Sequence, residues 1–474
     1  MKKAAPSYKC KSTHYDLIVI GSGPGGHRAA VQASKLGKSS IVIEKDKMGG
    51  ASLHLGTIPS KTLREAALSS KYTQGTIADI MYRTHSVIDD EKDVTEEHFR
   101  RNKVEAVTGT ASFVDKKTVK IVNPEGETCV TGDMILIATG TRPRRPPEMN
   151  FDGKTLFDSD SILGLSHQLK NLLVLGAGVI GCEYSSIFAR MGVKVTLIDS
   201  RDELLSSIDK EIVEALKSQF EKSGVTLKLS TTFTNLESTK KSNGSYVASV
   251  DLQSNSATSG DESGGDVQSR NFDAVLYCLG RTGNHELLNL EAIGLQADAR
   301  GLLSVNSNYQ TSVPSIYAVG DIIGAPALAA SATEQGRLAV LHAFAGEKAH
   351  FPDTFPYGIY TIPEISSVGV QEAQLQKKGI KYVVGKAPYP VLARGKMIDD
   401  EFGFLKLLVH QRTRQIMGVH VIGTSATELV HIGQVAMAFG ATVDFFIDNV
   451  FNYPTLAEAY KVAALNAESK LDKL

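Results

Sequence analysis

The chain of 474 residues contains no tryptophan, only four cysteines and no excess of charge of either sign. Its 51 Lys and Arg side chains against 52 Asp and Glu give a formal net charge of −1. This balance argues against nucleic acid or an acidic surface as a partner. No stretch reaches the ~18 consecutive apolar residues that a membrane helix needs. The sequence therefore predicts a protein that neither binds nucleic acid nor spans a membrane.

The four cysteines, Cys10, Cys129, Cys182 and Cys278, lie far apart in the sequence. They form neither a CxxC pair nor a cluster with the spacing of metal ligands, so we expect no metal site. We expect reduced cysteines, with Cys182 and Cys278 buried in apolar segments. The N-terminus lacks an apolar run of secretory length, which favours the cytoplasm. A short organelle-targeting arm at residues 1–14 stays open as an alternative.

A dinucleotide-binding fingerprint follows the first apolar run, residues 15–20. Glycine at Gly21 permits the tight turn, Gly23 lets the backbone approach a pyrophosphate, and Gly26 allows the next helix to pack on the strand. The N-terminus of that helix offers N–H groups and a positive dipole end to phosphates. Glu44, which ends the following strand, can accept hydrogen bonds from ribose hydroxyls. These residues predict a nucleotide site and leave FAD and NAD open.

A second fingerprint comes after the apolar run 171–175 and contains the three glycines Gly176, Gly178 and Gly181. The strand that follows ends in Asp199 and Arg201. An acid at this place favours the 2′-hydroxyl of NAD, whereas an arginine can hold the 2′-phosphate of NADP. We interpret the pair as permitting both cofactors. The alternative is that one of the two side chains simply faces solvent.

Two further stretches resemble the FAD motifs of two-dinucleotide flavoproteins. Residues 133–143 carry an apolar strand into a turn with Thr139 and Gly140, and residues 311–321 end in Asp321. In such flavoproteins the aspartate binds a ribityl hydroxyl of the flavin. Together with the first fingerprint, these resemblances imply FAD as the first nucleotide.

The segment from Gly49 to Lys61 is similar to the active-site helix of the pyridine nucleotide-disulfide reductases, which reads G-G-x-C-x-x-x-x-C-x-P-S-K. Ser52 and Thr57 occupy the positions of the two redox-active cysteines, and neither side chain can form a disulfide. The resemblance implies that Lys61 lies near the flavin N5 and pairs with Glu183. A surface lysine and a surface glutamate are the structural alternatives.

The C-terminal third shows a second departure from that family. Disulfide reductases carry H-x-H-P-T-x-x-E across the dimer interface, whereas this chain has Tyr453 in place of the second histidine and keeps Glu458. A tyrosine with a pKa near ~10 is a poor proton shuttle for a thiol at neutral pH. The dithiol and its base are therefore both absent.

The pattern predicts an α/β protein with two Rossmann-like dinucleotide-binding domains, for FAD and NAD(P), and a C-terminal α+β dimerisation domain. We place the first part of the FAD domain at 1–155, the NAD(P) domain at 156–283, the second part of the FAD domain at 284–350 and the dimerisation domain at 351–474. Gly280 belongs to the strand and turn that close the NAD(P) domain, and it is a further cofactor-binding candidate. The polar residues 240–270 predict a long solvated hairpin loop. In the last domain we expect strands at 363–369, 403–409 and 416–423 and helices at 426–437 and 457–465.

Over nearly its whole length, from Tyr15 to Asn466, the chain resembles the soluble, Si-specific pyridine nucleotide transhydrogenases. That family keeps threonine at the second cysteine position, as Thr57 does here, but commonly retains the first cysteine, where this chain has Ser52. The resemblance implies FAD as cofactor, NAD(H) and NADP(H) as substrates, and a homodimer or a higher oligomer. Hydride would pass reversibly between NADPH and NAD⁺ through flavin N5 without protein thiols.

Two other functions stay open. One is a thiol-independent NAD(P)H oxidase or quinone reductase, a diaphorase, in which oxygen or a quinone takes the electrons. The other is a catalytically silent flavoprotein that serves as a scaffold. Hydride transfer from NADPH to a second nicotinamide in the absence of oxygen distinguishes a transhydrogenase from both alternatives.

Overall fold

The structure is a computed structural model that describes residues 13–69, 77–240, 242, 246–254 and 267–473. The chain divides into two compact units, which are described separately below. The first unit consists of Met1–Leu63, Ala78–Pro147 and Gly280–Phe351, and the second of Arg64–Ile77, Glu148–Leu279 and Pro352–Leu474. Neither unit is continuous in sequence, because each is completed by a later return of the chain.

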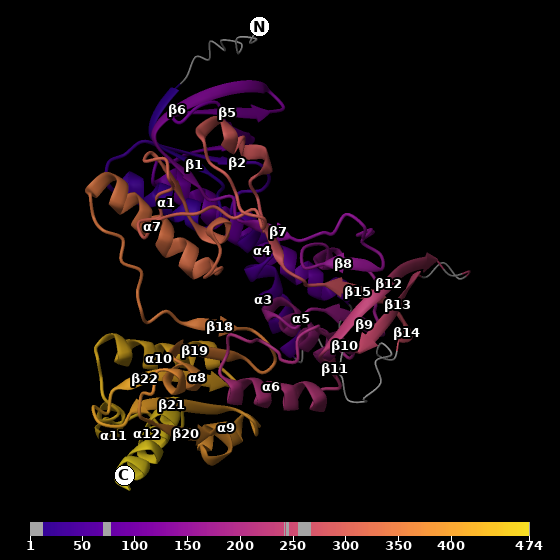
Figure 1. The fold of residues 1–474 in the computed structure, drawn as a ribbon, viewed down its shortest axis with the longest axis vertical. Helices are drawn as coiled ribbons and strands as arrows, with labels where there is room; N and C mark the ends of the chain where they lie inside the picture. Colours follow the sequence, from indigo (N-terminus) through magenta and orange to yellow (C-terminus); the bar gives the residue numbers. More distant parts are fainter. Residues whose placement is uncertain (1–12, 70–76, 241, 243–245, 255–266, 474) are drawn as a thin grey trace. The chain divides into compact units, whose positions relative to one another are not determined.

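The first unit is built on a seven-stranded sheet in the order β3-β2-β1-β6-β5-β4, with β17 also paired to β6. Strands β1, β2, β5 and β6 of this sheet are labelled in Figure 1. Strands β3, β2, β1, β6 and β17 pair in parallel, and β5 and β4 add antiparallel pairs. The short strands β7 and β16 form a separate antiparallel pair. The strands are β1 (Thr13–Ile20), β2 (Ser40–Glu44), β3 (Glu105–Thr108), β4 (Thr110–Phe113), β5 (Thr118–Asn123), β6 (Gly126–Ile137), β7 (Thr141–Pro143), β16 (Arg281–Gly283) and β17 (Ile316–Ala318).

Strand β1 is apolar at residues 17–20 because this part is buried on both faces, as parallel strands usually are. Its alternate side chains enter two cores: Ile18 packs on one face of the sheet, and Leu17 and Val19 pack on the other with α1. Helices α1 and α7 contact each other beside this sheet. The helices are α1 (Pro24–Lys35), α2 (Gly50–His54), α3 (Thr57–Leu68), α4 (Ile77–Arg101) and α7 (Ala329–Ala345), with 3₁₀ turns η2 (Glu286–Leu288), η3 (Leu290–Ile293) and η4 (Gly320–Ile323). Helix α3 is divided between the two units, since its residues from Arg64 onward belong to the second.

The second unit contains an all-parallel sheet in the order β11-β10-β9-β15-β8 and a three-stranded antiparallel sheet, β12-β13-β14. The parallel sheet is the second nucleotide-binding-type unit that the sequence predicted. Its elements are β8 (Leu156–Asp158), η1 (Ser161–Gly164), β9 (Asn171–Leu175), α5 (Val179–Arg190), β10 (Lys194–Ile198), α6 (Lys210–Lys222), β11 (Thr226–Lys228), β12 (Thr231–Lys240), β13 (Tyr246–Ser254), β14 (Val267–Phe272) and β15 (Ala274–Tyr277).

The prediction of a long hairpin loop at 240–270 is wrong for most of the described part of that stretch. Residues 246–254 form β13 and residues 267–272 form β14, and Ala248, Val250 and Leu252 of β13 are buried. The inward residues alternate with polar ones, so the strand has a low average hydrophobicity despite one buried face. Residues 255–266, the centre of the predicted loop, lie outside the described residues.

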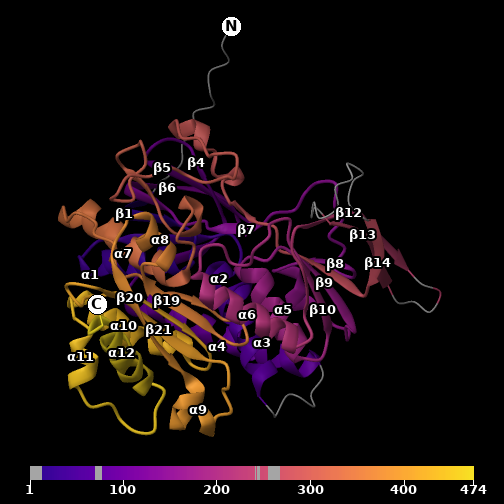
Figure 2. The same cartoon turned by 60° about the horizontal axis from the view of Figure 1, so that its bottom comes forward.

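The C-terminal part of the second unit is an antiparallel sheet in the order β18-β19-β22-β21-β20. Helices α10 and α12 pack against it and share one core with it, which includes Leu405, Val419 and Tyr460 (Figure 2). The elements are β18 (Tyr357–Ile359), β19 (Ile365–Gly369), α8 (Glu372–Lys377), β20 (Tyr382–Pro388), η5 (Tyr389–Val391), α9 (Ala393–Met397), β21 (Phe404–His410), β22 (Ile416–Ile422), α10 (Ala426–Ala438), α11 (Asp444–Asp448) and α12 (Glu458–Leu471).

The predicted fold class, α/β with an α+β C-terminal part, is confirmed by these sheets. The three predicted C-terminal strands and the helix at 426–437 are present within a few residues, whereas the last helix runs to Leu471 rather than to residue 465. Among the described helices, none is long and apolar enough to cross a membrane.

One expectation about the cysteines is wrong. Cys129 is disulfide-bonded rather than reduced, and Cys10 lies outside the described residues. Cys182 and Cys278 are free thiols, the first buried and the second half-buried. Spacing in the sequence could not reveal the Cys129 bond, because disulfide geometry depends on distance in space.

Candidate functional site

The first glycine loop has the close packing that its motif requires. A Cβ at Gly26 would lie 1.9 Å from the Gly21 carbonyl oxygen, so helix α1 can approach β1 only if this residue is glycine. By contrast, a Cβ at Gly23 would meet no atom within 4 Å. Gly23 is also the N-cap of α1, and its side of the loop is therefore open to a group that binds the helix N-terminus.

Glu44 is bonded to the same loop from the end of β2. The side chain is buried, and Oε2 accepts hydrogen bonds from the Ser22 backbone N–H at 2.9 Å and the Ser22 hydroxyl at 2.7 Å. The Ser22 hydroxyl oxygen in turn accepts from the Gly49 N–H at 2.9 Å. Oε1 accepts from the Asp46 N–H at 3.1 Å. The carboxylate therefore braces the glycine loop and the start of the Gly49–Lys61 segment together.

The other FAD-motif residues of the first unit leave donors and acceptors for a ligand. Thr139 Oγ1 is buried and has no hydrogen-bond partner among the described residues. A Cβ at Gly140 would meet nothing within 4 Å, and the same holds for Gly280, which has φ of 95°. Asp321 lies on η4, where Oδ2 accepts from the Thr141 hydroxyl at 3.2 Å. An orphaned buried hydroxyl beside open backbone fits a bound polar cofactor, so these residues fit FAD.

The predicted active-site helix is divided in two. Helix α2 ends at His54 and α3 begins at Thr57, so Ser52 and Thr57 lie on different helices across the Leu55–Gly56 break. Ser52 is half-buried and Thr57 is exposed. Lys61 lies on the second turn of α3, and its Nζ donates to Ser60 Oγ at 3.3 Å. The segment thus keeps the lysine on a regular helix and replaces the dithiol with two hydroxyls.

The second glycine loop, in the second unit, repeats the packing of the first. A Cβ at Gly181 would lie 1.8 Å from the Gly176 carbonyl oxygen, and one at Gly178 would meet no atom within 4 Å. Asp199 is buried, and Oδ2 accepts from the Ala177 N–H at 2.7 Å. The carboxylate therefore braces this loop from the end of β10 just as Glu44 braces the first loop from β2.

Arg201 forms a bidentate ion pair with Asp199, with Nε–Oδ1 at 3.0 Å and Nη2–Oδ2 at 2.7 Å. Burial raises the pKa of Asp199, but hydrogen bonds from the Arg201 side chain and backbone and from Ala177 outweigh it, so the net pKa is lowered. The Arg201 side chain is 50% exposed, whereas that of Asp199 is 3% exposed. The Asp199 carboxylate is thus used to bind the glycine loop, whereas one side of the Arg201 guanidinium stays exposed to solvent.

Glu183 is buried on α5, two residues after the last glycine of the second loop. Its Oε1 accepts from the Tyr360 backbone N–H at 2.8 Å. Burial raises the pKa of Tyr357, and the charge of Glu183 raises it further. The prediction that Glu183 points inward rather than lying on the surface agrees with this burial, while its pairing with Lys61 stays a prediction.

The residues at the positions of the reductase acid/base pair lie near the start of α12, with Tyr453 in place of the histidine and Glu458 retained. Tyr453 is 68% exposed, and Glu458 begins the helix with Oε2 buried and unpartnered within the described part of the chain. A phenol is a poor proton shuttle for a thiol at neutral pH, so Tyr453 does not replace the function of the histidine.

Three carboxylates of the second unit, from Asp209, Glu211 and Glu372, lie close enough together to hold a metal ion. The ammonium of Lys406 already occupies the place of a cation among them. Its Nζ lies 2.9 Å from Asp209 and 3.1 Å from Glu211, and it also pairs with Glu372. The Lys406 side chain is fully buried, whereas Glu211 and Glu372 are partly exposed, so the lysine itself supplies the cation of this cluster.

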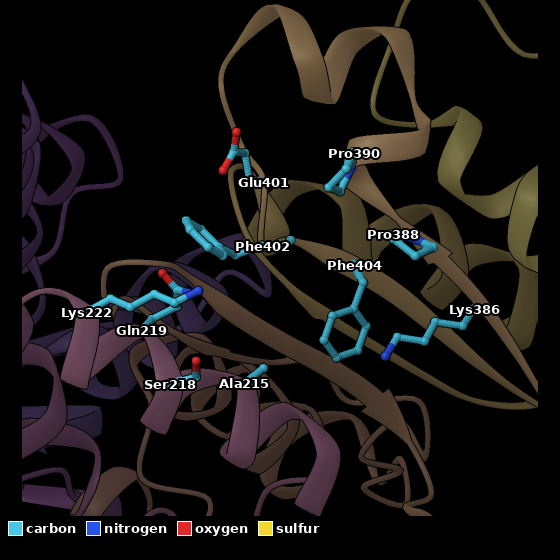
Figure 3. A pocket seen from close by; sticks show the side chains of 11 residues that line it. Ala215, Ser218, Gln219, Lys222, Lys386, Pro388, Pro390, Glu401, Phe402 and Phe404 are labelled. Carbon is cyan, nitrogen blue, oxygen red and sulfur yellow. The ribbon is translucent and has the colours of Figure 1, made fainter.

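A hollow in the second unit lies between helix α6 and strands β20 and β21 (Figure 3). Two lysines at its wall stack on aromatic rings: Lys222 Nζ lies 4.2 Å from the centroid of Phe402, and Lys386 Nζ lies 3.9 Å from that of Phe404. Lys386 also pairs with Glu211. None of the predicted site residues lines this hollow.

Two family models cover most of the chain. Residues 15–336 match the pyridine nucleotide-disulphide oxidoreductase model, and residues 355–464 match the dimerisation domain of the same family. The chain belongs to the pyridine nucleotide-disulphide oxidoreductase family. This membership accounts for the two glycine loops and for the antiparallel C-terminal sheet.

Within this family the chain is similar over nearly its full length to named transhydrogenases. It is 44% identical to the soluble pyridine nucleotide transhydrogenase of Mycobacterium tuberculosis (strain ATCC 25177 / H37Ra), over 97% of this chain and 98% of that protein. It is 43% identical to the protein of the same name from Vibrio atlanticus (strain LGP32), over 97% and 99%. The resemblance to soluble pyridine nucleotide transhydrogenase found in the sequence motifs is confirmed.

A solved oxidoreductase of the same fold is the HOCl-induced flavoprotein disulfide reductase RclA from Escherichia coli. It superposes with a TM-score of 0.83 at 24% identity, covering 95% of this chain and 100% of that one. At this identity the likeness supports the fold alone.

Sequence reasoning missed three buried polar residues: Ser22, which bonds to Glu44, Arg64, which pairs with Glu364, and Lys406. Ser22 stands between two fingerprint glycines, so its place in the motif was the available signal. A charged residue in an otherwise amphipathic helix or strand, as with Arg64 and Lys406, is ordinarily exposed. Only the partners that face them from distant segments reveal their burial.

Proposed function

We propose that this protein is an FAD-dependent transhydrogenase that moves hydride reversibly between NADPH and NAD⁺ without a redox-active disulfide. The observation that carries the proposal is the pair Ser52 and Thr57 at the two cysteine positions of a chain that is otherwise similar throughout to soluble pyridine nucleotide transhydrogenases. With no thiol pair to accept electrons, the acceptor must be a molecule that diffuses to the site.

FAD is the cofactor in this proposal, and its flavin supplies a ring that accepts and donates hydride when bound. The chain's part is to bind and orient. Gly21, Gly23 and Gly26 present the α1 N-terminus to the pyrophosphate, and Glu44 holds the loop in that shape. The unpartnered hydroxyl of Thr139, with Gly140 and Asp321, contributes the remaining polar contacts.

Lys61 places a positive charge on helix α3. It does not have to give up a proton, because hydride transfer between the two rings needs no protein acid or base. We propose that this charge favours electron density on the flavin ring. Glu183 is the proposed partner of Lys61.

The nicotinamide cofactors bind, in this proposal, at the second loop, with Gly176, Gly178, Gly181 and the α5 N-terminus facing the pyrophosphate. Because Asp199 is held by Ala177 and Arg201, we propose that the exposed side of Arg201 decides how the 2′ position is recognised. A 2′-phosphate can share the guanidinium, and a 2′-hydroxyl leaves the ion pair intact. One site can therefore accept both nucleotides, and Gly280 stays a further cofactor-binding candidate.

The deciding experiment mixes the purified holoprotein with NADPH and thio-NAD⁺ without oxygen. Formation of thio-NADH at the rate of NADPH loss is the expected result. NADPH loss only when oxygen or a quinone is added would instead establish the diaphorase function. A flavin that no nicotinamide bleaches would establish the silent scaffold.

A homodimer is the proposed assembly, since the C-terminal part matches a dimerisation-domain model. The same part exposes large apolar side chains that a second copy could cover: Val435, Phe439, Phe445, Val450, Tyr453 and Leu465. Light scattering of the holoprotein should give twice the chain mass, and a larger mass would show the higher oligomer that we also predicted.

Three finer points stay predictions. Si-specific transfer is tested with NADPH deuterated at the pro-S position of C4, which should form NADP⁺ that has lost the deuterium. The cytoplasmic location is tested by fractionating cells and blotting for the chain. The domain boundaries at 155, 283 and 350 are tested by limited proteolysis.

A further inference from the structure

Arg64 is a buried arginine on helix α3, three residues after Lys61. Each of its three guanidinium nitrogens has a partner among the described residues. Nε donates to the Thr361 carbonyl oxygen at 3.1 Å, and Nη2 lies 2.9 Å from Glu364 Oε1. Nη1 donates to Glu65 Oε1 at 2.5 Å. Only 5% of the side chain is exposed. A guanidinium is tolerated at this burial because its donors have partners.

The main partner, Glu364, is itself held from the other side. Its Oε2 accepts from the Thr427 hydroxyl at 2.8 Å and from the Thr427 backbone N–H at 3.1 Å. Its own carbonyl oxygen accepts from the Gly423 N–H at 2.9 Å. The carboxylate that receives Arg64 is therefore anchored to the end of β22 and the start of α10, and it cannot swing to follow the arginine.

Arg64 and Glu183 bind neighbouring residues of one short segment. Residues 360–364, which we call the linker, join β18 to β19. The Tyr360 N–H donates to Glu183 Oε1 at 2.8 Å, and the Ile362 N–H donates to Ser186 Oγ at 3.0 Å. The residue between them, Thr361, accepts from Arg64 through its carbonyl oxygen. The linker therefore binds helix α5 and helix α3 through three consecutive residues.

We infer that Arg64 is a positioning residue for hydride transfer, which holds the turn of α3 that bears Lys61 on the linker that also binds Glu183. This inference rests on the proposed function. Residues three apart on a helix are neighbours, so a displacement of Arg64 carries the Lys61 backbone with it. The linker thereby joins the helices of the two proposed catalytic residues through directional hydrogen bonds.

A purely structural role for Arg64 makes a different prediction. Replacing a buried ion pair with apolar residues of similar volume is often neutral or stabilising, so stability alone does not require the guanidinium. The bond from Nε to the Thr361 carbonyl has a direction that an apolar side chain cannot reproduce. Stability and flavin chemistry should therefore separate when the pair is replaced.

The test uses the FAD-loaded full chain with Arg64→Met, Arg64→Lys and the double variant Arg64→Met with Glu364→Met. Two readouts are the limiting rate of flavin bleaching by NADPH in stopped flow and the midpoint potential of the bound flavin. We expect Arg64→Met to slow bleaching at least tenfold and to lower the potential, with the Kd for NADPH changed less than threefold. Arg64→Lys should recover part of the rate. The double variant should recover the thermal midpoint but not the rate.

The matched control is Arg414→Met, which removes a half-buried Arg–Asp pair in the same unit. It should leave the rate and the potential within twofold of the unmodified chain. A single or double variant that bleaches at the unmodified rate with an unmodified potential would overturn the inference. If Arg64→Met does not fold, the double variant and Thr427→Val decide the question. The hydroxyl lost in Thr427→Val supports Glu364, and the rate should fall several-fold.

Failure of the proposed function would look different. In that case the unmodified chain would not pass hydride from NADPH to thio-NAD⁺, whatever Arg64 does. Failure of the inference alone would leave transhydrogenation intact and the Arg64 variants indistinguishable from the unmodified chain in both flavin readouts.

Discussion

Arg201 donates hydrogen bonds from two nitrogens to the Asp199 carboxylate, which in turn accepts a hydrogen bond at 2.7 Å from the N–H of Ala177 in the second glycine loop. The acid and the arginine that favour different nicotinamide cofactors are therefore parts of one ion pair. The buried acid shapes the loop, and the half-exposed arginine faces outward.

Arg201→Ala should weaken NADPH binding more than NADH binding. A charge-assisted hydrogen bond contributes about 1.5–3 kcal/mol, which corresponds to roughly a tenfold to hundredfold change in Kd. We expect that loss for NADPH and less than a threefold change for NADH, measured by quenching of flavin fluorescence. Arg270→Ala, on the exposed strand β14, is the control. Equal losses for both nucleotides would refute the role.

Glu44→Ala should release FAD. The substitution removes the acceptor of the two Ser22 hydrogen bonds and leaves a buried N–H unpaired in the glycine loop. At about 1.5–3 kcal/mol for a bond to a charged group, the Kd for FAD should rise at least tenfold. Ultrafiltration followed by flavin fluorescence measures the released cofactor. Glu105→Ala removes a carboxylate that bonds to Tyr15 on the same sheet and should retain FAD.

Thiol reagents should not inactivate the protein through Cys182 or Cys278. Burial raises the pKa of each thiol, and nearby acidic groups raise it further, so both stay protonated from pH 6 to pH 9. Treatment with N-ethylmaleimide across this pH range should leave transhydrogenation within twofold, without a rise in sensitivity at the alkaline end. Cys182→Ala and Cys278→Ala should behave alike. Rapid alkaline inactivation that Cys182→Ala abolishes would contradict this prediction.

Lys406→Met should destabilise the second unit strongly. Burial lowers the pKa of Lys406, but bonds to Asp209 and Glu372 outweigh it, and the net pKa is raised. Removing one partner of a buried ion pair costs about 3–5 kcal/mol, and in this variant the buried Asp209 carboxylate loses its counter-charge. Urea denaturation measures the loss. Lys120→Met breaks a partly exposed pair and should cost about 0–1 kcal/mol.

Lys406→Met should also reverse the way in which the free energy of unfolding changes with pH. Asp209 and Glu211 have lowered pKa values in the folded chain, since their bonds to lysines outweigh burial, so their contribution is present above the unfolded values of about 4. It is lost as the pH falls through the lowered folded values. Without Lys406 the clustered carboxylates should bind protons more readily when folded, so Lys406→Met should gain stability between pH 7 and pH 5. A parallel pH profile in both proteins would contradict this account.

Local sequence determined the strand–turn–helix units of this protein. The glycines at positions 26 and 181 are required by close approach of backbone to backbone, and their spacing is readable without knowledge of the rest of the chain. The sequence alone also shows that Ser52 and Thr57 cannot form a disulfide, because neither side chain contains sulfur. The strands at 246–254 and 267–272 escaped prediction, since polar residues interrupt the apolar ones in the first and make up most of the second.

Tertiary structure alone decided what the buried charges do. Arg64 meets Glu364 across 300 residues of sequence, and Lys406 meets Asp209 across 197. No local pattern encodes such pairs, because a charged side chain enters the interior only where the fold brings an opposite charge to it. The sequence alone determined which redox chemistry is missing, and the packing of distant segments decided how the remaining groups are held.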